Sequence, residues 1–97
     1  MAAYIVATVT ITDAEAFAAS GKGIAGLAEQ FGGESVVKGP VAEMLEGDPV
    51  PGERIVVSRY PDADAARAYI ASPQYQAALK LREGAATVSM RLLIDPA

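Results

Sequence analysis

The sequence predicts one α+β domain, over residues 1–97, whose elements follow the order β-α-β-β-α-β. Three observations lead to this prediction. Four short segments rich in β-branched residues alternate apolar and polar side chains with the period of a strand. Two longer segments between them carry apolar residues at helical spacing and begin at residues that cap helices. Glycine and proline clusters separate the segments, as turns require.

The first strand and first helix are expected at residues 3–11 and from Asp13 onwards. The strand AYIVATVTI has two unlike faces, one with Ile5, Ala7, Val9 and Ile11 and the other with Tyr4, Val6, Thr8 and Thr10. The segment TDAE then resembles a capping box, in which Thr12 caps the helix and Glu15 reaches back. Apolar residues at helical spacing carry the helix through Phe31, and Gly32-Gly33 ends it.

The middle of the chain predicts two more strands. ESVVKG, at 34–39, is a short strand that Gly39-Pro40 ends, and VAEMLEG after it could continue as a ribbon. The segment DPVPG, at 48–52, is typical of a turn. ERIVVSRY, at 53–60, is the third strand, with Ile55 and Val57 on one face and Val56, Ser58 and Tyr60 on the other.

A second helix, broken at Ser72-Pro73, and a fourth strand complete the order. DADAARAYIAS is helical, and Ser72 as N-cap with Pro73 at the first helical position restarts the helix as far as Gly84. ATVSMRLLID, at 86–95, alternates like a strand. This order is that of the ferredoxin-like fold, with a four-stranded antiparallel sheet.

Helices in such a fold cover one face of the sheet and leave the other bare. We expect the bare face to carry mainly apolar side chains, namely Tyr4, Val6, Thr8, Val56, Tyr60 and Leu93. Because an apolar face of this kind is poorly suited to water, the sequence predicts a homodimer that buries it.

Composition and charge exclude several classes of function. The net charge of −4, with scattered acidic residues, argues against nucleic acid as a partner. The chain has no cysteine and no histidine, which removes disulfides, the usual zinc sites and the commonest general base near neutral pH. Its amino-terminal segment resembles neither a signal peptide nor a membrane span, so we expect a cytoplasmic protein with no membrane partner.

The stretch SGKGIAG, at 20–26, contains the spacing G-x-G-x-x-G. In dinucleotide-binding folds that spacing lies at the turn between a strand and the start of a helix. Here the capping box places the glycines inside a helix, and Gly23 rather than Ser or Thr follows Lys22, which excludes a Walker loop. We therefore expect no phosphate cradle, but a helix that is irregular, closely packed or mobile at its middle.

Four segments together resemble one known family: AYIVATVTITDAEAF, FGG, VVKGPVAEMLEGD and SPQYQAALKLREGA. They are similar to the bacterial domain-of-unknown-function family thirteen-thirty, within the dimeric α/β-barrel superfamily. The resemblance implies the ferredoxin-like fold and a two-fold dimer, but no activity, because the wider superfamily includes cofactor-free monooxygenases, isomerases, haem enzymes and stress-response proteins. Ser20, Pro49 and Arg59 depart from the residues that the family commonly has at these positions.

Three residues are candidates for ligand binding. Lys38, at a strand end, could meet an anionic group, although it could equally be a solvated lysine. Tyr75 and Arg82 lie seven residues apart on the last helix, and hence on the same face, where they could bracket a pocket between helix and sheet. Each also has a structural alternative, Tyr75 as a core ring and Arg82 as a rim or interface cation.

Other polar residues are weaker candidates. Two carboxylates, Glu43 and Glu46, make a poor metal site without histidine, and we expect them to be edge charges. Arg59 and Arg91 could form a positive patch or pair with acidic residues. Tyr4 and Tyr60 are expected at a dimer interface.

These observations favour a protein that binds a small organic molecule, with an anionic one as an option, between the sheet and the helices. It could be a cofactor-free oxygenase or isomerase, and a protein without histidine is not expected to hold haem. A non-enzymatic dimeric binding, assembly or stress-response module is the alternative. We expect no cofactor and no metal. The sequence leaves open whether the protein is an enzyme, and it assigns no catalytic residues.

Overall fold

The structure is a computed structural model, and it describes residues 1–96; position 97 of the predicted domain lies outside the described residues. The elements in chain order are β1 (Ala3–Ile11), α1 (Ala14–Gly23), α2 (Leu27–Gln30), β2 (Glu34–Pro40), β3 (Glu53–Tyr60), α3 (Ala63–Ala71), α4 (Pro73–Leu81) and β4 (Ala86–Ile94). The predicted order is confirmed, with both helical segments divided in two.

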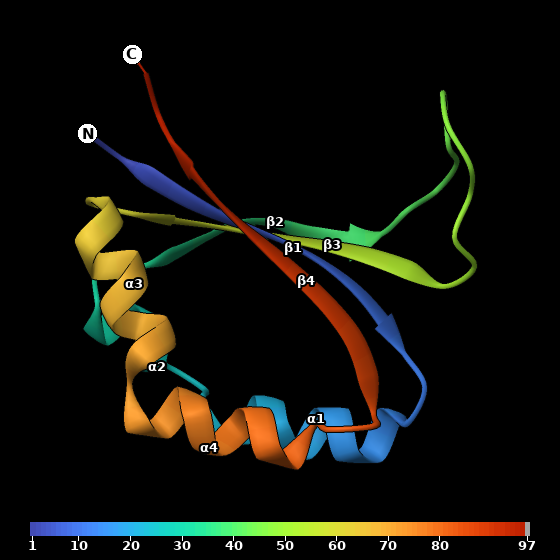
Figure 1. The fold of residues 1–97 in the computed structure, drawn as a ribbon, viewed down its shortest axis with the longest axis horizontal. Helices are drawn as coiled ribbons and strands as arrows, with labels where there is room; N and C mark the ends of the chain where they lie inside the picture. The colour runs from blue at the N-terminus through green and yellow to red at the C-terminus, as the bar shows by residue number, and fades with distance from the viewer. Residues whose placement is uncertain (97) are drawn as a thin grey trace.

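The four strands form one antiparallel sheet in the order β2-β3-β1-β4, and the helices lie on one side of it (Figure 1). β1 is central, with Ala3 opposite Tyr60 of β3 and Ile94 of β4. Its helix-facing side chains are buried, as the alternation predicts: Ala3, Ile5, Ala7 and Val9. This is the split β-α-β arrangement of the ferredoxin-like fold.

The first helix starts one residue later than the capping box predicts. Its N-cap is Asp13, whose Oδ1 accepts from the backbone N–H of Ala16 at 3.2 Å. Thr12 is engaged elsewhere, because its hydroxyl donates to the carbonyl of Gly84 at 3.0 Å and its N–H to that of Ala85 at 2.7 Å. Thr12 therefore fastens the end of β1 to the turn before β4, and the prediction of Thr12 as the cap was wrong.

The helix also does not run through to Phe31. α1 ends at Gly23, and Gly26 adopts a left-handed backbone with φ 77° before the single turn of α2. The glycines are thus not all inside a helix, as the sequence predicted: Gly21 and Gly23 lie in the last turn of α1, and Gly26 makes the break. The expected irregularity is present, and its cause is this left-handed residue.

The break at Ser72-Pro73 is confirmed, and one side chain explains it. The Ser72 hydroxyl accepts from the N–H of Tyr75 at 3.2 Å, which caps α4, and donates to the carbonyl of Tyr69 at 2.7 Å, at the end of α3. Pro73 occupies the first turn of α4, where its missing N–H costs nothing. The two helices therefore turn sharply about a buried serine.

The side assigned to β3 was wrong, and the pairing register shows why. Val56 lies opposite Ala7 and Tyr60 opposite Ala3, so both point to the helices, and Tyr60 is 1% exposed. Ile55 and Val57 face the other way. We call that bare side the open face; it carries Tyr4, Val6, Ile55, Val57 and Leu93. Tyr60 is therefore a core residue and not a residue of a dimer interface.

The connection between β2 and β3 is longer than predicted. Residues 41–52 form no continuation of β2, so the proposed ribbon is wrong. Two backbone hydrogen bonds tie this segment to Glu53: the Val41 N–H donates to the Glu53 carbonyl at 2.9 Å, and the Glu53 N–H donates to the Val50 carbonyl at 3.2 Å. Figure 1 shows this loop extending beyond the sheet, away from the helices. Leu45, within this loop, is 89% exposed.

Candidate functional site

The helix side of the sheet is organised around tyrosine rings. The Tyr69 ring centroid lies 5.8 Å from that of Tyr60, 5.0 Å from that of Tyr75 and 6.1 Å from that of Phe31. Burial, then the neighbouring Tyr75, raises the pKa of the Tyr69 phenol to about 12, and burial raises the pKa of Tyr60 further above its usual range. Both phenols are therefore neutral hydrogen-bonding groups at neutral pH.

A cavity of about 160 Å³ lies between the sheet and the helices, and we refer to it as the cavity. The strands line it through Val56, Val88 and Met90, and the helices through Phe17, Ile70 and Tyr75. Its lining is mostly apolar, with a few phenol and hydroxyl groups and the guanidinium of Arg82. Ligand sites have this character, although they are usually larger, at about 300 Å³ or more.

Tyr75 and Arg82 meet in this cavity. An Nη2–H of Arg82 donates to the Tyr75 hydroxyl oxygen at 3.3 Å, and the guanidinium carbon lies 5.6 Å from the ring centroid. The Tyr75 hydroxyl in turn lies 3.4 Å from the Met90 sulfur, to which it donates. The seven-residue spacing thus predicted the proximity of this pair, and we call the chain Arg82, Tyr75 and Met90 the bridge.

A buried serine sets the distance between the helices above the cavity. The Ser20 hydroxyl donates to the carbonyl of Ala78 at 2.9 Å, which joins α1 directly to α4. α1 packs chiefly on α4 rather than on a strand. A large aromatic side chain at position 20 would push α1 and α4 apart, whereas the small Ser20 allows the two helices to pack closely. The cavity lies between this pair of helices and the sheet.

Lys38 is not brought together with the other two candidates. It lies on the outer strand β2, its side chain is exposed, and it does not line the cavity. The register places it opposite Val56, on the helix-facing side of the sheet, one strand outside the cavity wall. A ligand-binding role for Lys38 therefore stays a prediction.

Of the weaker candidates, Tyr60 lines the cavity and the others do not. Glu43 and Glu46 are exposed in the loop at 41–52. Arg59 is paired with Glu34 at 3.5 Å, and a hydrogen bond to Tyr4, then Glu34, raises the pKa of its guanidinium. Among residues 1–96 no three His, Cys, Asp or Glu side chains group as a metal site would require, and no helix there is long and apolar enough to cross a membrane.

Sequence reasoning missed two groups that line the cavity. Met90 was recognised only as a strand residue, although its sulfur receives the Tyr75 hydroxyl. Tyr69 was not singled out, although its ring contacts three other aromatic rings. The spacing of Ala66, Tyr69 and Ile70 on one side of α3 is the signal that could have identified Tyr69.

Several solved structures share this fold. The RPA0582 protein of unknown function from Rhodopseudomonas palustris has a TM-score of 0.79 and 26% identity, over 98% of this chain and 84% of that one. SnoaB, a cofactor-independent oxygenase from Streptomyces nogalater, has a TM-score of 0.68 and 15% identity, over 99% and 94% of the two chains. A dimeric ferredoxin-like protein of unknown function from Jannaschia sp. CCS1 has a TM-score of 0.71 and 13% identity, over 98% and 100%.

These likenesses support the fold rather than an activity, because two of the three identities are low and two of the three proteins have no known function. No curated protein matches the sequence. The family model described as a domain of unknown function, DUF1330, matches residues 2–95. That match covers nearly the whole chain and agrees with the order of strands and helices, so the chain belongs to the DUF1330 family.

Proposed function

We propose that the protein is a homodimer that binds a small organic molecule in the cavity between its sheet and its helices. The observation that carries this proposal is the pairing of Arg82 with the Tyr75 hydroxyl, 3.3 Å apart, inside an otherwise mostly apolar lining. An apolar pocket with a few convergent polar groups is the usual form of a small-molecule site. The apolar part of the ligand would contact the strands, and its oxygen atoms would accept from Arg82 and Tyr75.

The homodimer is supported by the open face and by the fold. Val6 and Val57 are neighbours at its centre, and Leu93 at its border is 51% exposed. Ferredoxin-like proteins of similar structure from Jannaschia sp. and Bacteroides fragilis are dimeric. Pairing through this face would leave the cavity, on the other side of the sheet, open to a ligand. A cytoplasmic location stays a prediction of the sequence.

If the protein is an enzyme, we favour oxygenation or isomerisation of a conjugated substrate without a cofactor. The fold is shared with SnoaB, a cofactor-independent oxygenase, at 15% identity. A guanidinium and a phenol can stabilise negative charge that develops on a substrate oxygen. In an oxygenation the substrate itself would supply the electrons and dioxygen would accept them, whereas an isomerisation needs no external electron donor or acceptor.

Binding without turnover is the second candidate, and the lining of the cavity favours it. Among residues 1–96, those that line the cavity include no carboxylate, histidine, cysteine or lysine, so they supply no general base that titrates near neutral pH. A dimeric binding module needs none.

The proposal can be tested by titrating the protein with benzoate while recording backbone amide NMR signals. We expect the signals of Tyr75, Val88 and Ile70 to move together, and the dissociation constant to rise about tenfold in Arg82→Gln, since a hydrogen bond to a charged group is lost. Arg54→Gln, an exposed arginine outside the cavity, is the matched control. Native mass spectrometry of the purified protein would in parallel detect a retained ligand.

Two results would contradict the proposal. One is a set of shifts confined to exposed surface residues. The other is equal weakening by Arg82→Gln and Arg54→Gln, because a general loss of positive charge would then explain the effect. Substrate turnover by the wild-type protein, with none by Arg82→Gln, would separate the enzyme from the binding module.

A further inference from the structure

Three hollows follow one another along the helix-facing side of β4. Ala86 and Val88 line a hollow of about 390 Å³ that also contains Glu83, which we call the Glu83 hollow. Val88 and Met90 line the cavity. Met90 and Leu92 line a third hollow, of about 420 Å³, together with Arg67 of α3, which we call the Arg67 hollow. Neighbouring hollows therefore share lining residues. Side chains at every second position of β4 point to the same face of the sheet, so they form a single row.

The row exists because the helices stand off from this edge of the sheet. α1 and α4 pack on each other, and among the helices that the structure describes only α3 has more than minor contact with β4. Met90 and Leu92 therefore stay 40% and 37% exposed on the side of the sheet that the helices cover elsewhere. Apolar side chains left uncovered in a concave region are typical of a binding site.

The bridge crosses this row at its centre. Met90 belongs to both the cavity and the Arg67 hollow, and the Tyr75 hydroxyl holds its sulfur at 3.4 Å. A thioether is a weak acceptor on a flexible side chain, so a rotation of Met90 would cost little. Such a rotation would join the cavity to the Arg67 hollow, since Ile5 and Ile70 already line both.

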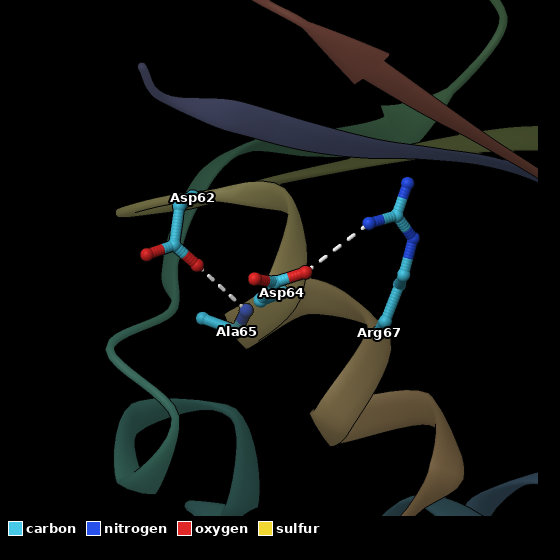
Figure 2. A network of polar contacts seen from close by, with 4 residues as sticks. All are labelled: Asp62, Asp64, Ala65 and Arg67. Atoms are coloured by element: carbon cyan, nitrogen blue, oxygen red, sulfur yellow. Dashed lines mark hydrogen bonds and ion pairs between the residues drawn. The ribbon is translucent and has the colours of Figure 1, made fainter.

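The charge along the joined hollows favours an anion. The protein has a net charge of −4, yet among the described residues no acidic one lines the cavity or the Arg67 hollow. Arg67 has one ion pair, with Asp64 at 3.2 Å, and Figure 2 shows its guanidinium extending from α3 towards the strands. Because the two side chains are 62% and 94% exposed, the pair is weak and a ligand carboxylate can replace Asp64.

We propose that the ligand of the cavity is an elongated amphipathic carboxylic acid whose carboxylate binds Arg67, whose apolar body passes Met90, and whose far end carries an oxygen atom that accepts from Tyr75 and Arg82. This inference rests on the proposed function and adds the chemical class of the ligand. The span from Leu92 to Val88 along the strand is about 13 Å, since a strand rises about 3.3 Å per residue. An acid with an apolar chain of that length reaches from the Arg67 hollow into the cavity.

The test compares three probes that share one chain, decanoate, decanol and decylammonium, each below its aggregation concentration, with benzoate as a short acid. Binding is followed by calorimetry and by the amide signals of Leu92, Met90 and Tyr75. We expect decanoate to bind most tightly and to move all three signals. Arg67→Gln should weaken decanoate about fivefold and leave decanol unchanged, since an exposed charge pair contributes about that much. Arg54→Gln, which lines none of the three hollows, should change neither.

The outcomes separate this inference from the proposed function. If benzoate moves the Tyr75 signal but decanoate binds no more tightly, or Arg67→Gln has no effect, the elongated acid is wrong and the cavity site stands. Equal binding of decylammonium also overturns it, since the preference for an anion is then absent. If neither acid moves the signals of Tyr75 and Met90, both proposals fail.

Discussion

At the scale of single residues, Tyr69 connects the core to the cavity. Its ring contacts those of Tyr60 and Tyr75, and it is 9% exposed. Because a charged phenolate would lose its hydration there, the folded protein holds the proton more tightly than the unfolded chain does. Because the pKa of this phenol differs between the folded and unfolded states, the stability of the protein changes with pH in the alkaline range.

We expect the free energy of unfolding to fall between pH 10 and pH 12. The ordinary pKa of the phenol is 10.0 and that of Tyr69 in the fold is about 12, so in this range the unfolded chain binds fewer protons than the folded one. The stabilisation is complete below the lower value and is lost as pH rises through the upper one. The slope per pH unit is at most about 1.4 kcal/mol for one group.

Urea unfolding at about pH 9 and at about pH 11 measures this effect. Tyr69→Phe should reduce the fall and leave a remainder, because the pKa of Tyr60 is raised in the same direction. If the free energy of unfolding of Tyr69→Phe falls between these two pH values by as much as that of the wild type, Tyr69 does not contribute to the effect.

Gly33 is a second residue with a specific role. A Cβ at this position would lie 2.5 Å from Cε2 of Tyr60 and 2.9 Å from the carbonyl oxygen of Ala28. We expect Gly33→Ala to lower the free energy of unfolding by about 1–3 kcal/mol, because the Tyr60 ring must move in a filled core. In the control, Gly39→Ala, nothing lies within 4 Å of the new carbon, and the change should stay below about 1 kcal/mol. Equal effects in the two variants, measured by thermal or urea unfolding, would contradict this explanation.

How much of the site the sequence predicts depends on how local each relation is. Tyr75 and Arg82 belong to one short helical segment, so their spacing alone places them on one side. Tyr60 was misjudged because its surroundings depend on which strands become neighbours. The alternation along β3 was predicted correctly, but only its pairing with β1 shows that Tyr60 faces the helices.

At the scale of elements, helix boundaries that local residues decide were predictable from the sequence, and those that depend on distant contacts were not. The Ser72-Pro73 break was predictable because one residue carries the cap and the next cannot continue a helix. The break at Gly26 was not, because Ile24, Leu27 and Phe31 keep helical spacing across it. The start of α1 was shifted because Thr12 and Asp13 are both good caps, and a contact with the distant Gly84 decides between them.

The glycines of the stretch at 20–26 can be distinguished by substitution. Gly21 has helical surroundings with nothing within 4 Å of an added Cβ, so Gly21→Ala should stabilise the protein by up to about 1 kcal/mol. Gly26 has φ +77° and equally open surroundings, so Gly26→Ala should destabilise it by about 1 kcal/mol. Thermal unfolding of both variants measures the contrast. If both substitutions stabilise, the left-handed turn at Gly26 is not a fixed part of the fold.

At the scale of the whole molecule, the open face can be tested by adding one charge. Val57→Glu places a carboxylate beside Val6 at the centre of the face, and burying it in an interface would be costly. We expect light scattering to give a dimer mass for the wild type and a monomer mass for this variant. Leu81→Glu, on α4, is the control and should stay dimeric; its side chain is already 55% exposed. A wild-type monomer at micromolar concentrations would refute the homodimer.

The position of β4 in the chain also has a consequence for folding. Of the four strands of the sheet, β4 is synthesised last, and it pairs with β1, so the pairing of Ala3 with Ile94 forms only after the other three strands have been synthesised. Contacts so distant in sequence form slowly. Because β4 lines every hollow of the row, a nascent chain in which β4 has not yet been synthesised has no site for a ligand. A ligand would therefore stabilise only the finished fold, and its presence during synthesis would raise the yield of native protein without accelerating the early steps.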